Sequence, residues 1–386
     1  MTRVTYVLTK HVQPSQTFVT GEICELRRRG VEVQVIAIEH GEQDDSGTRY
    51  LADVAACRSD VRRAHLRAAR RRPWGYVRFL LDVARMRSEM GRRPEQVPWT
   101  LLPLVSAEVE AAGSRALHAH FAWSGAAAAR LLSLLTGLPW SMTLHAKDIF
   151  SKQRNLQHKL ATADRLITVC DYNTAWMREH LGLVRPVSLV VCGVEVVDGW
   201  ERAGDADVVT VGRLVEKKGI DVLVRAAAEL RRSRPELRVD IIGEGPERRR
   251  LEALVDELGL QDCVRLLGSL SHEESLARIA GARVFCLPAR IAPDGDRDSM
   301  PVVIKEAMVR EVPVVGTDIV GIPEMLDDGC GLLVPPDDPA ALAAALELLL
   351  KDTGLSKDLA TAARARVRER FAMAAEVEKL ERVLLP

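Results

Sequence analysis

The sequence predicts an α/β protein of two domains, each built around a parallel β-sheet. The first observation is length, because 386 residues exceed one ordinary domain and fit two of about 190. The second is a strand–helix–strand pattern that starts at residue 4 and starts again at residue 207. Short loops in such a pattern favour parallel strands joined by right-handed crossovers. The third is a polar, Gly-containing stretch over 198–207, which predicts the boundary between the two runs.

The first run alternates strands with helices up to that boundary. Its expected strands cover 4–8, 31–38, 115–120, 139–145, 163–169 and 187–191, and its expected helices cover 18–29, 124–135 and 171–181. Polar residues follow the ends of the first, third and fourth strands. They are His11, Gln16, His118, His120, His145 and Asp148. In an open α/β sheet, ligands bind outside the carboxyl ends of the strands. A lone histidine is more often structural, but three at two strand ends favour a functional role for at least one.

The second run repeats the pattern, and its first loop is basic. Its expected strands cover 207–212, 237–242, 263–267, 283–288, 312–316 and 331–335, with helices over 220–232 and 338–350 and a helical C-terminus. The loop Gly212-Arg-x5-Gly219 brings a guanidinium, Arg213, and an ammonium, Lys218, to one place. Two fixed cations suit a phosphate group, and a solvated basic loop is the alternative.

A short glycine motif follows the next strand. The sequence Gly243-Glu-Gly245-Pro is not a dinucleotide fingerprint, because the third glycine would fall at Arg248 and Pro246 interrupts the pattern. We expect the two glycines to let the backbone approach a nucleotide closely. Further on, Ser271 fits a capping box that starts another helix, with its glutamate three residues later.

The stretch from Asp298 to Glu306 combines a loop carboxylate with a helical one, eight positions apart. Pro301 is expected in the first helical turn, where its missing N–H costs nothing. The N–H groups and the positive dipole end around Met300, Pro301 and Val302 then form an anion site. One turn later, Glu306 can accept hydrogen bonds from hydroxyl groups. Amides for phosphate and carboxylates for hydroxyls suit a nucleotide sugar, whereas an amphipathic helix with two incidental acids is the bland alternative.

Composition limits the class of protein. Fifty-four basic side chains balance fifty-four acidic ones, so bulk charge gives no reason to expect a polyanionic partner. Seven scattered cysteines, without a C-x-x-C motif or zinc spacing, predict reduced core thiols in a cytosolic protein. The N-terminus has no signal-peptide pattern, and no apolar run reaches the roughly 18–20 residues of a membrane span. We therefore expect a cytoplasmic protein whose membrane association is at most peripheral.

Residues 58–93 form a basic segment. Twelve arginines against Asp60, Asp82 and Glu89 give a net charge of +9, and three aromatic residues are interleaved with them. A solvated pair of helices is one interpretation. A basic amphipathic surface at the inner face of an anionic membrane is the other, with ~1 kcal/mol for each basic residue near the lipid. No base-reading motif accompanies the segment, so nucleic acid is not expected.

The Asp298–Glu306 stretch resembles the E-x7-E motif of the retaining GT4 (group 1) glycosyltransferases, with aspartate in place of the first glutamate. The loop from His11 to Gln16 resembles the polysaccharide branch of that family, which includes colanic-acid-type enzymes. The resemblance covers nearly the whole chain and is strongest over 207–336. It implies a GT-B fold, in which two Rossmann-like β/α/β domains face a central cleft. The implied domains are an acceptor domain over 1–200, a donor domain over 201–365 and a C-terminal helix over 366–386 that crosses back to the first.

The resemblance also implies roles for single residues. Arg213 and Lys218 would hold the donor diphosphate, together with the helix start at Met300, Pro301 and Val302. The nucleoside would contact Gly243, Gly245, Arg265, Leu266 and Glu306. His145, Asp298 and Glu306 would be the catalytic residues, with His145 and Asp298 on the donor sugar. The acceptor would meet His11, Gln16, His120 and Asp148. Similar enzymes use no metal, and the one Asp-x-Asp pair, Asp294 and Asp296, lies in a loop beside the motif.

The function that we predict is sugar transfer from a UDP- or GDP-linked donor to an acceptor hydroxyl in exopolysaccharide or glycolipid assembly. The acceptor would be a sugar, a lipid-linked sugar or a small molecule, so natural-product biosynthesis is the rival pathway. An epimerase or hydrolase on the same fold would release UDP without an acceptor. A protein of another class, a non-catalytic binder at a membrane surface, would use residues 58–93.

Overall fold

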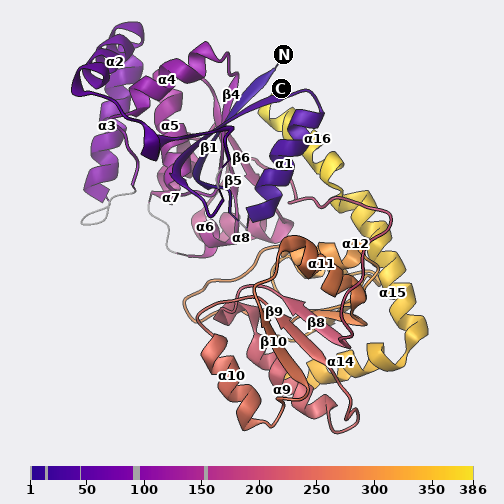
Figure 1. Cartoon of the computed structure of the whole chain (residues 1–386). Helices are drawn as coiled ribbons and strands as arrows, with labels where there is room; N and C mark the ends of the chain where they lie inside the picture. Colours follow the sequence, from indigo (N-terminus) through magenta and orange to yellow (C-terminus); the bar gives the residue numbers. More distant parts are fainter. Residues whose placement is uncertain (1, 14–15, 44, 90–95, 152–154, 386) are drawn as a thin grey trace. The chain divides into compact units, whose positions relative to one another are not determined.

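A computed structural model gives the structure of the chain and describes residues 2–13, 16–43, 45–89, 96–151 and 155–385. It shows two compact units (Figure 1). The first unit runs to Val191 and takes in the segment from Glu376 onwards, and the second is Cys192–Ala375. Every strand pair in both sheets is parallel, which confirms the predicted fold class.

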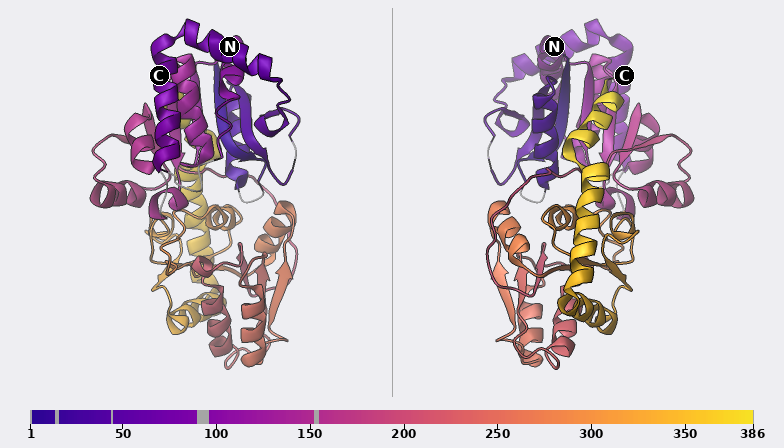
Figure 2. Two further views of the ribbon diagram at one scale, coloured as in Figure 1. Left: turned by 90° about the vertical axis from the view of Figure 1, so that its left-hand side faces the viewer. Right: turned by 90° about the vertical axis from the view of Figure 1, so that its right-hand side faces the viewer.

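The first unit has a seven-stranded sheet in the order β3-β2-β1-β4-β5-β6-β7. Its strands are β1 (Arg3–His11), β2 (Glu32–His40), β3 (Thr48–Tyr50), β4 (Ala116–His120), β5 (Trp140–Leu144), β6 (Arg165–Thr168) and β7 (Val187–Leu189). Its helices are α1 (Thr17–Arg28), η2 (Leu51–Asp53), α2 (Arg58–Arg71), α3 (Pro73–Glu89), α4 (Leu102–Ala111), α5 (Ser124–Thr136), α6 (Ala146–Phe150), α7 (Leu156–Thr162) and α8 (Asp171–Leu181). Helices cover both faces of the sheet (Figure 2). The strand order reverses between β1 and β4, so ligands are expected at the carboxyl ends of these two strands.

The second unit has a six-stranded sheet in the order β10-β9-β8-β11-β12-β13. Its strands are β8 (Val208–Val211), β9 (Val239–Ile242), β10 (Val264–Gly268), β11 (Val284–Leu287), β12 (Val314–Thr317) and β13 (Leu332–Val334). Its helices are η3 (Glu216–Lys218), α9 (Ile220–Leu230), α10 (Arg248–Glu257), α11 (His272–Gly281), α12 (Val302–Val309), α13 (Pro323–Leu326), α14 (Pro339–Lys351), α15 (Thr353–Arg366) and η4 (Val367–Phe371). Apolar residues of β8, β9 and β11 pack with α9, α10 and α14 in one core. The order reverses between β8 and β11, the second expected binding edge.

The last helix, α16 (Met373–Leu384), belongs largely to the first unit. Within that unit, the backbone N–H of Val191 donates to Glu376 Oε2 at 2.8 Å. Within the second unit, Val194 forms a parallel bridge with Ala372. Cys192 belongs to the second unit because its carbonyl accepts a hydrogen bond from Lys305 Nζ at 2.5 Å. The compact units therefore divide at residue 191, whereas we placed the boundary within 198–207.

The cysteines differ from the expectations. All seven cysteines are free, but Cys24 and Cys57 are exposed and so are not core thiols. Helices α2 and α3 form the outer edge of the first unit, at the upper left of Figure 1. Arg92 and Arg93, the end of the basic segment, lie outside the described residues. In the part of the chain that the structure describes, no helix combines the length and the apolar character that a membrane span requires.

Candidate functional site

Two loops begin at the carboxyl ends of β8 and β11, where the strand order of the second sheet reverses. The loop 212–219 follows β8, and the loop 288–301 follows the neighbouring strand β11. The predicted cations lie in the first loop and Asp298 lies in the second. Lys218 Nζ is 2.6 Å from Asp298 Oδ2, so the sheet brings the two predicted groups into an ion pair. Parallel neighbouring strands end at the same edge, which explains how residues 80 positions apart (298 − 218) come together.

Lys217, which the sequence analysis did not single out, completes this cluster. Its buried ammonium group lies 3.0 Å from Asp296 Oδ1 and 3.3 Å from Asp298 Oδ1. Burial alone would raise the pKa of Asp298, but the charges of Lys218 and Lys217 outweigh it and lower the pKa to about 2. Asp298 is therefore ionised at any ordinary pH. Asp296 is neutralised by Lys217, so the Asp-x-Asp pair is not an isolated acidic site.

Arg213 is exposed on the same loop. Among the residues that the structure describes, no hydrogen bond or ion pair engages its guanidinium group. The two loops carry three cations, Arg213, Lys217 and Lys218, and the carboxylates of Asp296 and Asp298 that pair with the two lysines. The sum, three minus two, leaves one positive charge for an anionic ligand.

Helix α12 begins at Val302, as the sequence predicts for the helical run 302–310, but Pro301 precedes the first turn. Pro301 is the N-cap residue (φ −59°, ψ 121°) and Val302 is the first helical residue, so the proline precedes the first turn. The physical reason is that Pro301 keeps an extended ψ. Ile304 N–H donates to the Pro301 carbonyl oxygen at 3.2 Å, whereas helix geometry leaves the N–H groups of Val302 and Val303 without a partner within the helix, where an anion could bind. Met300 is buried, whereas Val302 is only half-buried.

Glu306 lies in the second turn of α12, and its Oε1 is 3.8 Å from Nε2 of His272, at the start of α11. Burial raises the pKa of Glu306, although the charges of His272, Arg310 and Lys305 act against it. Burial also lowers the pKa of Arg310, against the charge of Glu306. A largely buried carboxyl with a raised pKa suits hydrogen bonds with ligand hydroxyls. His272 is a neighbour of Glu306 that the sequence alone did not reveal.

The two glycines after β9 make room for protein backbone. A Cβ atom on Gly243 would lie 2.0 Å from the carbonyl oxygen of Gly212, and one on Gly245 would lie 2.3 Å from that of Leu214. Gly243 also has φ +138°, a conformation that favours glycine. The sequence analysis assigned this closeness to a nucleotide. The structure instead shows that the glycines seat the loop 212–219, which carries Arg213 and Lys218.

The predicted nucleoside contacts on β10 do not reach the binding edge. Arg265 is the second residue of the strand, and its Nε donates to Asp240 Oδ1 at 2.6 Å. Its Nη2 donates to Asp205 Oδ1 at 2.9 Å, and Asp205 precedes β8. These partners hold Arg265 towards the amino ends of the strands. Leu266 packs against the hydrophobic core. The strand has the expected length but is shifted by one residue, so its carboxyl end is Gly268 and neither Arg265 nor Leu266 lies there.

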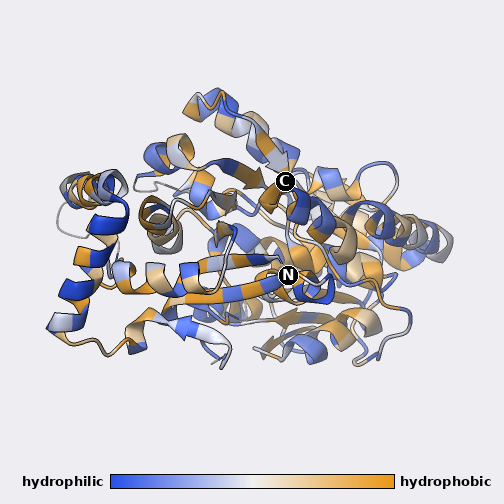
Figure 3. Ribbon diagram, turned by 90° about the horizontal axis from the view of Figure 1, so that it is seen from above, coloured by the Kyte–Doolittle hydropathy of each residue, from blue (hydrophilic) through white to orange (hydrophobic). Residues whose placement is uncertain are grey.

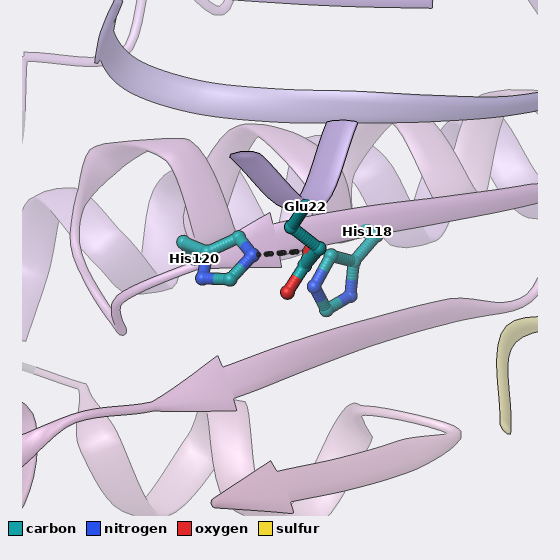
Figure 4. A group of neighbouring side chains, drawn as sticks. All are labelled: Glu22, His118 and His120. Atoms are coloured by element: carbon teal, nitrogen blue, oxygen red, sulfur yellow. Dashed lines mark hydrogen bonds and ion pairs between the residues drawn. The ribbon is translucent and has the colours of Figure 1, made fainter. Parts of the chain in front are cut away.

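In the first unit, the histidines form a buried network at the carboxyl ends of β4 and β5. His120 Nε2 is 2.9 Å from Glu22 Oε1, a residue of α1 (Figure 4). His120 Nδ1 is 3.2 Å from His145 Nε2. The Tyr6 hydroxyl, from β1, donates to the same oxygen of Glu22 at 2.6 Å. The reversal point between β1 and β4 thus brings Glu22 and Tyr6, which the sequence analysis missed, to the predicted histidines.

Aromatic rings hold His145 in place. Phe121, directly after β4, has φ +66° and its ring centroid lies 4.3 Å from that of His145. Phe18 of α1 lies 5.1 Å away on centroids. A bulky residue in the left-handed region costs about 1–2 kcal/mol, and such outliers concentrate at functional sites. The pKa of His145 is well below its ordinary value because of burial and the neighbouring His120, so the ring is neutral.

Asp148 is fully buried and acts through the backbone. Its Oδ2 accepts the N–H of His145 at 2.9 Å, which caps α6 and fixes the position of His145. Burial raises the pKa of Asp148 to about 7, although hydrogen bonds from His145 and Ala122 and the charges of Lys159 and Lys147 act against it. We assigned Asp148 to the acceptor side. In the structure, no atom of its side chain is open to a ligand.

The other two predicted acceptor contacts lie near the end of β1. His11 is buried, its Nε2 is 3.7 Å from Asp45 Oδ2, and burial lowers its pKa against the charge of Asp45. Gln16 is the half-buried N-cap residue of α1, and its side chain makes no capping hydrogen bond. Of the predicted acceptor residues, Gln16 alone has appreciable exposure. His120 is covered by Glu22 and His145.

Comparison with known proteins gives the family. The model of a glycosyl transferase 4-like domain matches residues 15–194, and the model of glycosyl transferases group 1 matches residues 199–366. A putative colanic acid biosynthesis glycosyltransferase, WcaL, of Salmonella typhimurium is 28% identical over 96% of both chains. The amylovoran biosynthesis glycosyltransferase AmsK of Erwinia amylovora is 27% identical, again over 96% of both.

Solved structures show the same fold. Sucrose-phosphate synthase from Thermosynechococcus elongatus superposes with a TM-score of 0.71, at 21% identity, over 99% of this chain and 98% of that one. Anabaena HepE, solved in complex with UDP, superposes with a TM-score of 0.67, at 18% identity, over 100% and 99%. The fold is therefore GT-B. With both sheets, both binding edges and both domain models in agreement, the chain belongs to the group 1 glycosyltransferases.

Proposed function

We propose that this glycosyltransferase moves a sugar, with retention, from a nucleoside diphosphate sugar to an acceptor hydroxyl in exopolysaccharide or glycolipid assembly. The observation that carries the proposal is the edge of the second sheet. There, Lys217 and Lys218 of the loop 212–219 pair with Asp298 of the loop 288–301, which leads into α12. Arg213 lies in the first loop, and Glu306 lies one turn into the helix. The relatives that match the full length are named for polysaccharide biosynthesis, which supports this class of product.

The cations supply the chemistry that the donor needs. As the bond to the sugar breaks, the diphosphate gains negative charge, and fixed positive groups stabilise that charge more than they stabilise the bound donor. Arg213 can bond two phosphate oxygens, whereas Lys218 acts as a point charge. Because these side chains already provide the positive charge, we propose a donor site that works without a metal. Glu306 would accept hydrogen bonds from the ribose, and Asp298 and His145 would contact the sugar.

Retention is proposed with attack on the same face of the sugar that the diphosphate leaves. In that mechanism a phosphate oxygen takes the proton of the acceptor hydroxyl, so no enzyme nucleophile is required. Lys217 and Lys218 keep Asp298 ionised and in ion pairs, which suits a contact to sugar hydroxyls more than a covalent step.

A thermal-shift panel with UDP, GDP, ADP, CMP and NAD tests the donor site. A ligand at ~100 times its dissociation constant stabilises the protein by about 2.7 kcal/mol, a shift of a few degrees. We expect one nucleoside diphosphate to stabilise the wild type and the exposed-site control Glu257→Ala, but not Glu306→Ala. Stabilisation by NAD alone, or by no ligand, would contradict the proposal.

A turnover assay distinguishes the proposed transferase from the rival functions. Release of UDP or GDP from a nucleotide sugar that needs no acceptor would favour a hydrolase or an epimerase. Small-molecule transfer has one specific support: α-D-kanosaminyltransferase of Streptomyces kanamyceticus is 33% identical over 47% of this chain. Turnover that depends on an aminoglycoside rather than on a lipid-linked sugar would favour that pathway.

We also propose that α2 and α3 dock on an anionic membrane. Five of the eight exposed large apolar side chains among the described residues lie on these helices. They are Leu66, Trp74, Val77, Leu80 and Leu81. Each of the ten arginines from Arg58 to Arg87 is exposed as well. In Figure 3, hydrophilic and hydrophobic bands alternate along these helices, at the left of the view. Trp74, Val77 and Leu81 follow the i, i+3, i+7 spacing of one helix face, as in helices that insert into a lipid interface.

Liposome co-sedimentation tests the docking. We expect binding to vesicles with phosphatidylglycerol and little binding to pure phosphatidylcholine, with release at high salt. The double variant Trp74→Ala/Leu81→Ala should bind less. Val184→Ala, which changes an equally exposed apolar residue of the same unit (95% exposed), should bind normally. Equal binding to both kinds of vesicle would exclude the proposal.

A further inference from the structure

The buried network around His145 extends well beyond the residues that family resemblance assigns. Four groups form a continuous chain: the Tyr6 hydroxyl, the Glu22 carboxylate, His120 and His145 (Figure 4 shows the central part). Tyr6, His120 and His145 are each at most 8% exposed, and the Glu22 side chain is 12% exposed. Solvent therefore does not compete for these hydrogen bonds, and each group is oriented by its neighbour.

The direction of each hydrogen bond follows from the chemistry of the carboxylate. An ionised carboxylate only accepts, so the Tyr6 O–H and the His120 Nε2–H must both donate to Glu22. A neutral His120 with its proton on Nε2 has a lone pair on Nδ1. His145 Nε2, 3.2 Å away, must then carry the proton of that bond. The Asp148 N–H donates to the backbone carbonyl oxygen of His145 at 3.0 Å.

We propose that Glu22 is a positioning residue that acts through His120 and holds the His145 ring with its proton on Nε2. Nδ1 is then the acceptor of the ring, which fits a sugar hydroxyl and not a carbonyl or phosphate oxygen. Phe18 and Phe121 both pack against the ring and limit its rotation. The sugar assignment rests on the proposed function, whereas the protonation state of the ring does not.

A metal ion is the other use of this cluster, because ligand atoms of Glu22, His118 and His120 lie within 4.8 Å of one another. The hydrogen bonds favour the positioning role. His118 Nδ1 is 2.9 Å from Ser141 Oγ, and its Nε2 is 3.3 Å from Thr143 Oγ1. Both ring nitrogens of His118 and both of His120 therefore already have protein partners. A metal would have to displace at least one of these hydrogen-bond partners from each ring.

Nuclear magnetic resonance of the full chain with ¹⁵N-labelled histidine tests the proposal without any activity. The ring ¹⁵N shifts and two-bond couplings of His145, assigned with His145→Gln, should show a neutral ring protonated on Nε2. Glu22→Leu should shift the ring towards the Nδ1-protonated form. Glu25→Leu, at another buried carboxylate of α1, should leave it unchanged. An Nδ1-protonated ring in the wild type overturns the proposal, and this holds even if no variant folds. One equivalent of tightly bound zinc by elemental analysis overturns it too.

Steady-state kinetics with the nucleotide sugar test whether the His145 ring contacts the substrate. We expect Glu22→Leu to lower kcat about tenfold, the worth of one hydrogen bond, with little change in KM. Unchanged kcat alongside a changed ring would overturn the sugar contact. A wild type that turns over no nucleotide sugar refutes the proposed function, while the ring measurement stands by itself.

Discussion

Asp298 is a carboxylate whose charge the second unit maintains with two lysines. Its pKa of about 2 lies below the ordinary 3.8, because Lys218 and Lys217 outweigh the effect of burial. The ionised form therefore stabilises the native state, fully above pH ~4 and progressively less as pH falls towards 2. We expect Asp298→Asn to lower the free energy of unfolding by about 2 kcal/mol near pH 5, a loss that shrinks towards pH 2.

Urea unfolding of both proteins between pH 5 and pH 2 measures that difference. Asp294→Asn, at an exposed carboxylate of the same loop, should show no such pH dependence. A constant difference between wild type and Asp298→Asn across this range would mean that the lysines do not hold the charge.

The pKa of Asp148 is shifted in the opposite direction, so its protonation affects stability with the opposite dependence on pH. Burial raises its pKa to about 7, so the native state keeps a proton that the unfolded chain releases near pH 4. The stability from this proton is full below pH ~4 and is lost as pH rises through 7. Asp148→Asn keeps an oxygen for the His145 N–H and carries no charge. We expect it to exceed the wild type in stability at pH 8, by on the order of 3 kcal/mol, and to match it near pH 4.

Denaturant midpoints at pH 4, 6 and 8 follow this change, with Asp262→Asn, on the exposed surface of the second unit, as the control. A variant that is less stable than the wild type at pH 8 would show that the native protein stabilises the ionised carboxylate, which a raised pKa excludes.

At the residue scale, the sequence revealed groups whose role depends on their position along the chain. Arg213, Lys218, Asp298 and Glu306 stand out because each follows a strand end or starts a helix. Lys217 did not stand out, because its neighbour Lys218 has the same charge and only the η3 turn decides which side chain points where. The partners of the histidines were equally hidden, since Glu22 and His120 are 98 residues apart.

At the scale of the elements, the position of the loop 212–219 depends on Gly243 and Gly245, because a side chain on either would collide with the loop backbone. Gly245→Ala would place a Cβ 2.3 Å from the carbonyl oxygen of Leu214 and push the loops apart. We expect a loss of stability of about 1–3 kcal/mol and weaker nucleoside diphosphate binding, because Arg213 and Lys218 move with their loop. Gly259→Ala is the matched control. It meets nothing within 4 Å, and its φ of +63° costs about 1 kcal/mol without affecting binding.

Isothermal titration with the diphosphate that the thermal panel identifies separates the two variants. If Gly245→Ala binds as tightly as Gly259→Ala, the loop does not need this close packing.

Element boundaries show what local sequence can determine. The Ser271 capping box appears as predicted, with Ser271 N–H to Glu274 Oε2 at 2.9 Å, because all its atoms lie within four residues. Helix α12 starts at Val302 as predicted, but Pro301 is the N-cap residue and not part of the first turn, since proline fits both positions. Arg265 was misplaced because its partners, Asp205 and Asp240, come from two other segments.

At the scale of the whole chain, the first unit is completed by α16. Val377, Leu380 and Leu384 are each at most 2% exposed, and Glu376 satisfies the N–H of Val191. A chain that ends at Ala372 loses three buried side chains, about 5–9 kcal/mol of apolar burial. That is comparable to the stability of a domain. We expect the first unit to lose its protection in hydrogen exchange while β8, β9 and β11 of the second stay protected.

Single substitutions test the same point in a chain that keeps its length. Leu380→Ala should cost about 2–5 kcal/mol, and Arg382→Ala, on the exposed face of α16, almost nothing. Loss of protection in the second unit instead of the first would contradict this assignment of the helix.

The division of the chain was the feature that composition located least well. The polar stretch 198–207 resembles a linker, yet Asp198 is paired with Arg364 and Arg368 of the second unit. Two long-range contacts set the actual division, the Val194–Ala372 bridge and the Lys305–Cys192 hydrogen bond. Neither contact can be predicted from the residues that neighbour it in the sequence.

The late return of α16 has a consequence for biosynthesis. The ribosome makes Val191 and then 184 further residues (375 − 191) before it reaches Glu376. At about 5–20 residues per second, that delay lasts roughly 10–40 seconds. During this time the nascent first unit exposes the apolar surface that α16 will cover, whereas the second unit is contiguous and can fold as soon as it emerges. The first unit is therefore translated first but completes its folding last. It is the unit whose exposed apolar surface a chaperone would need to cover.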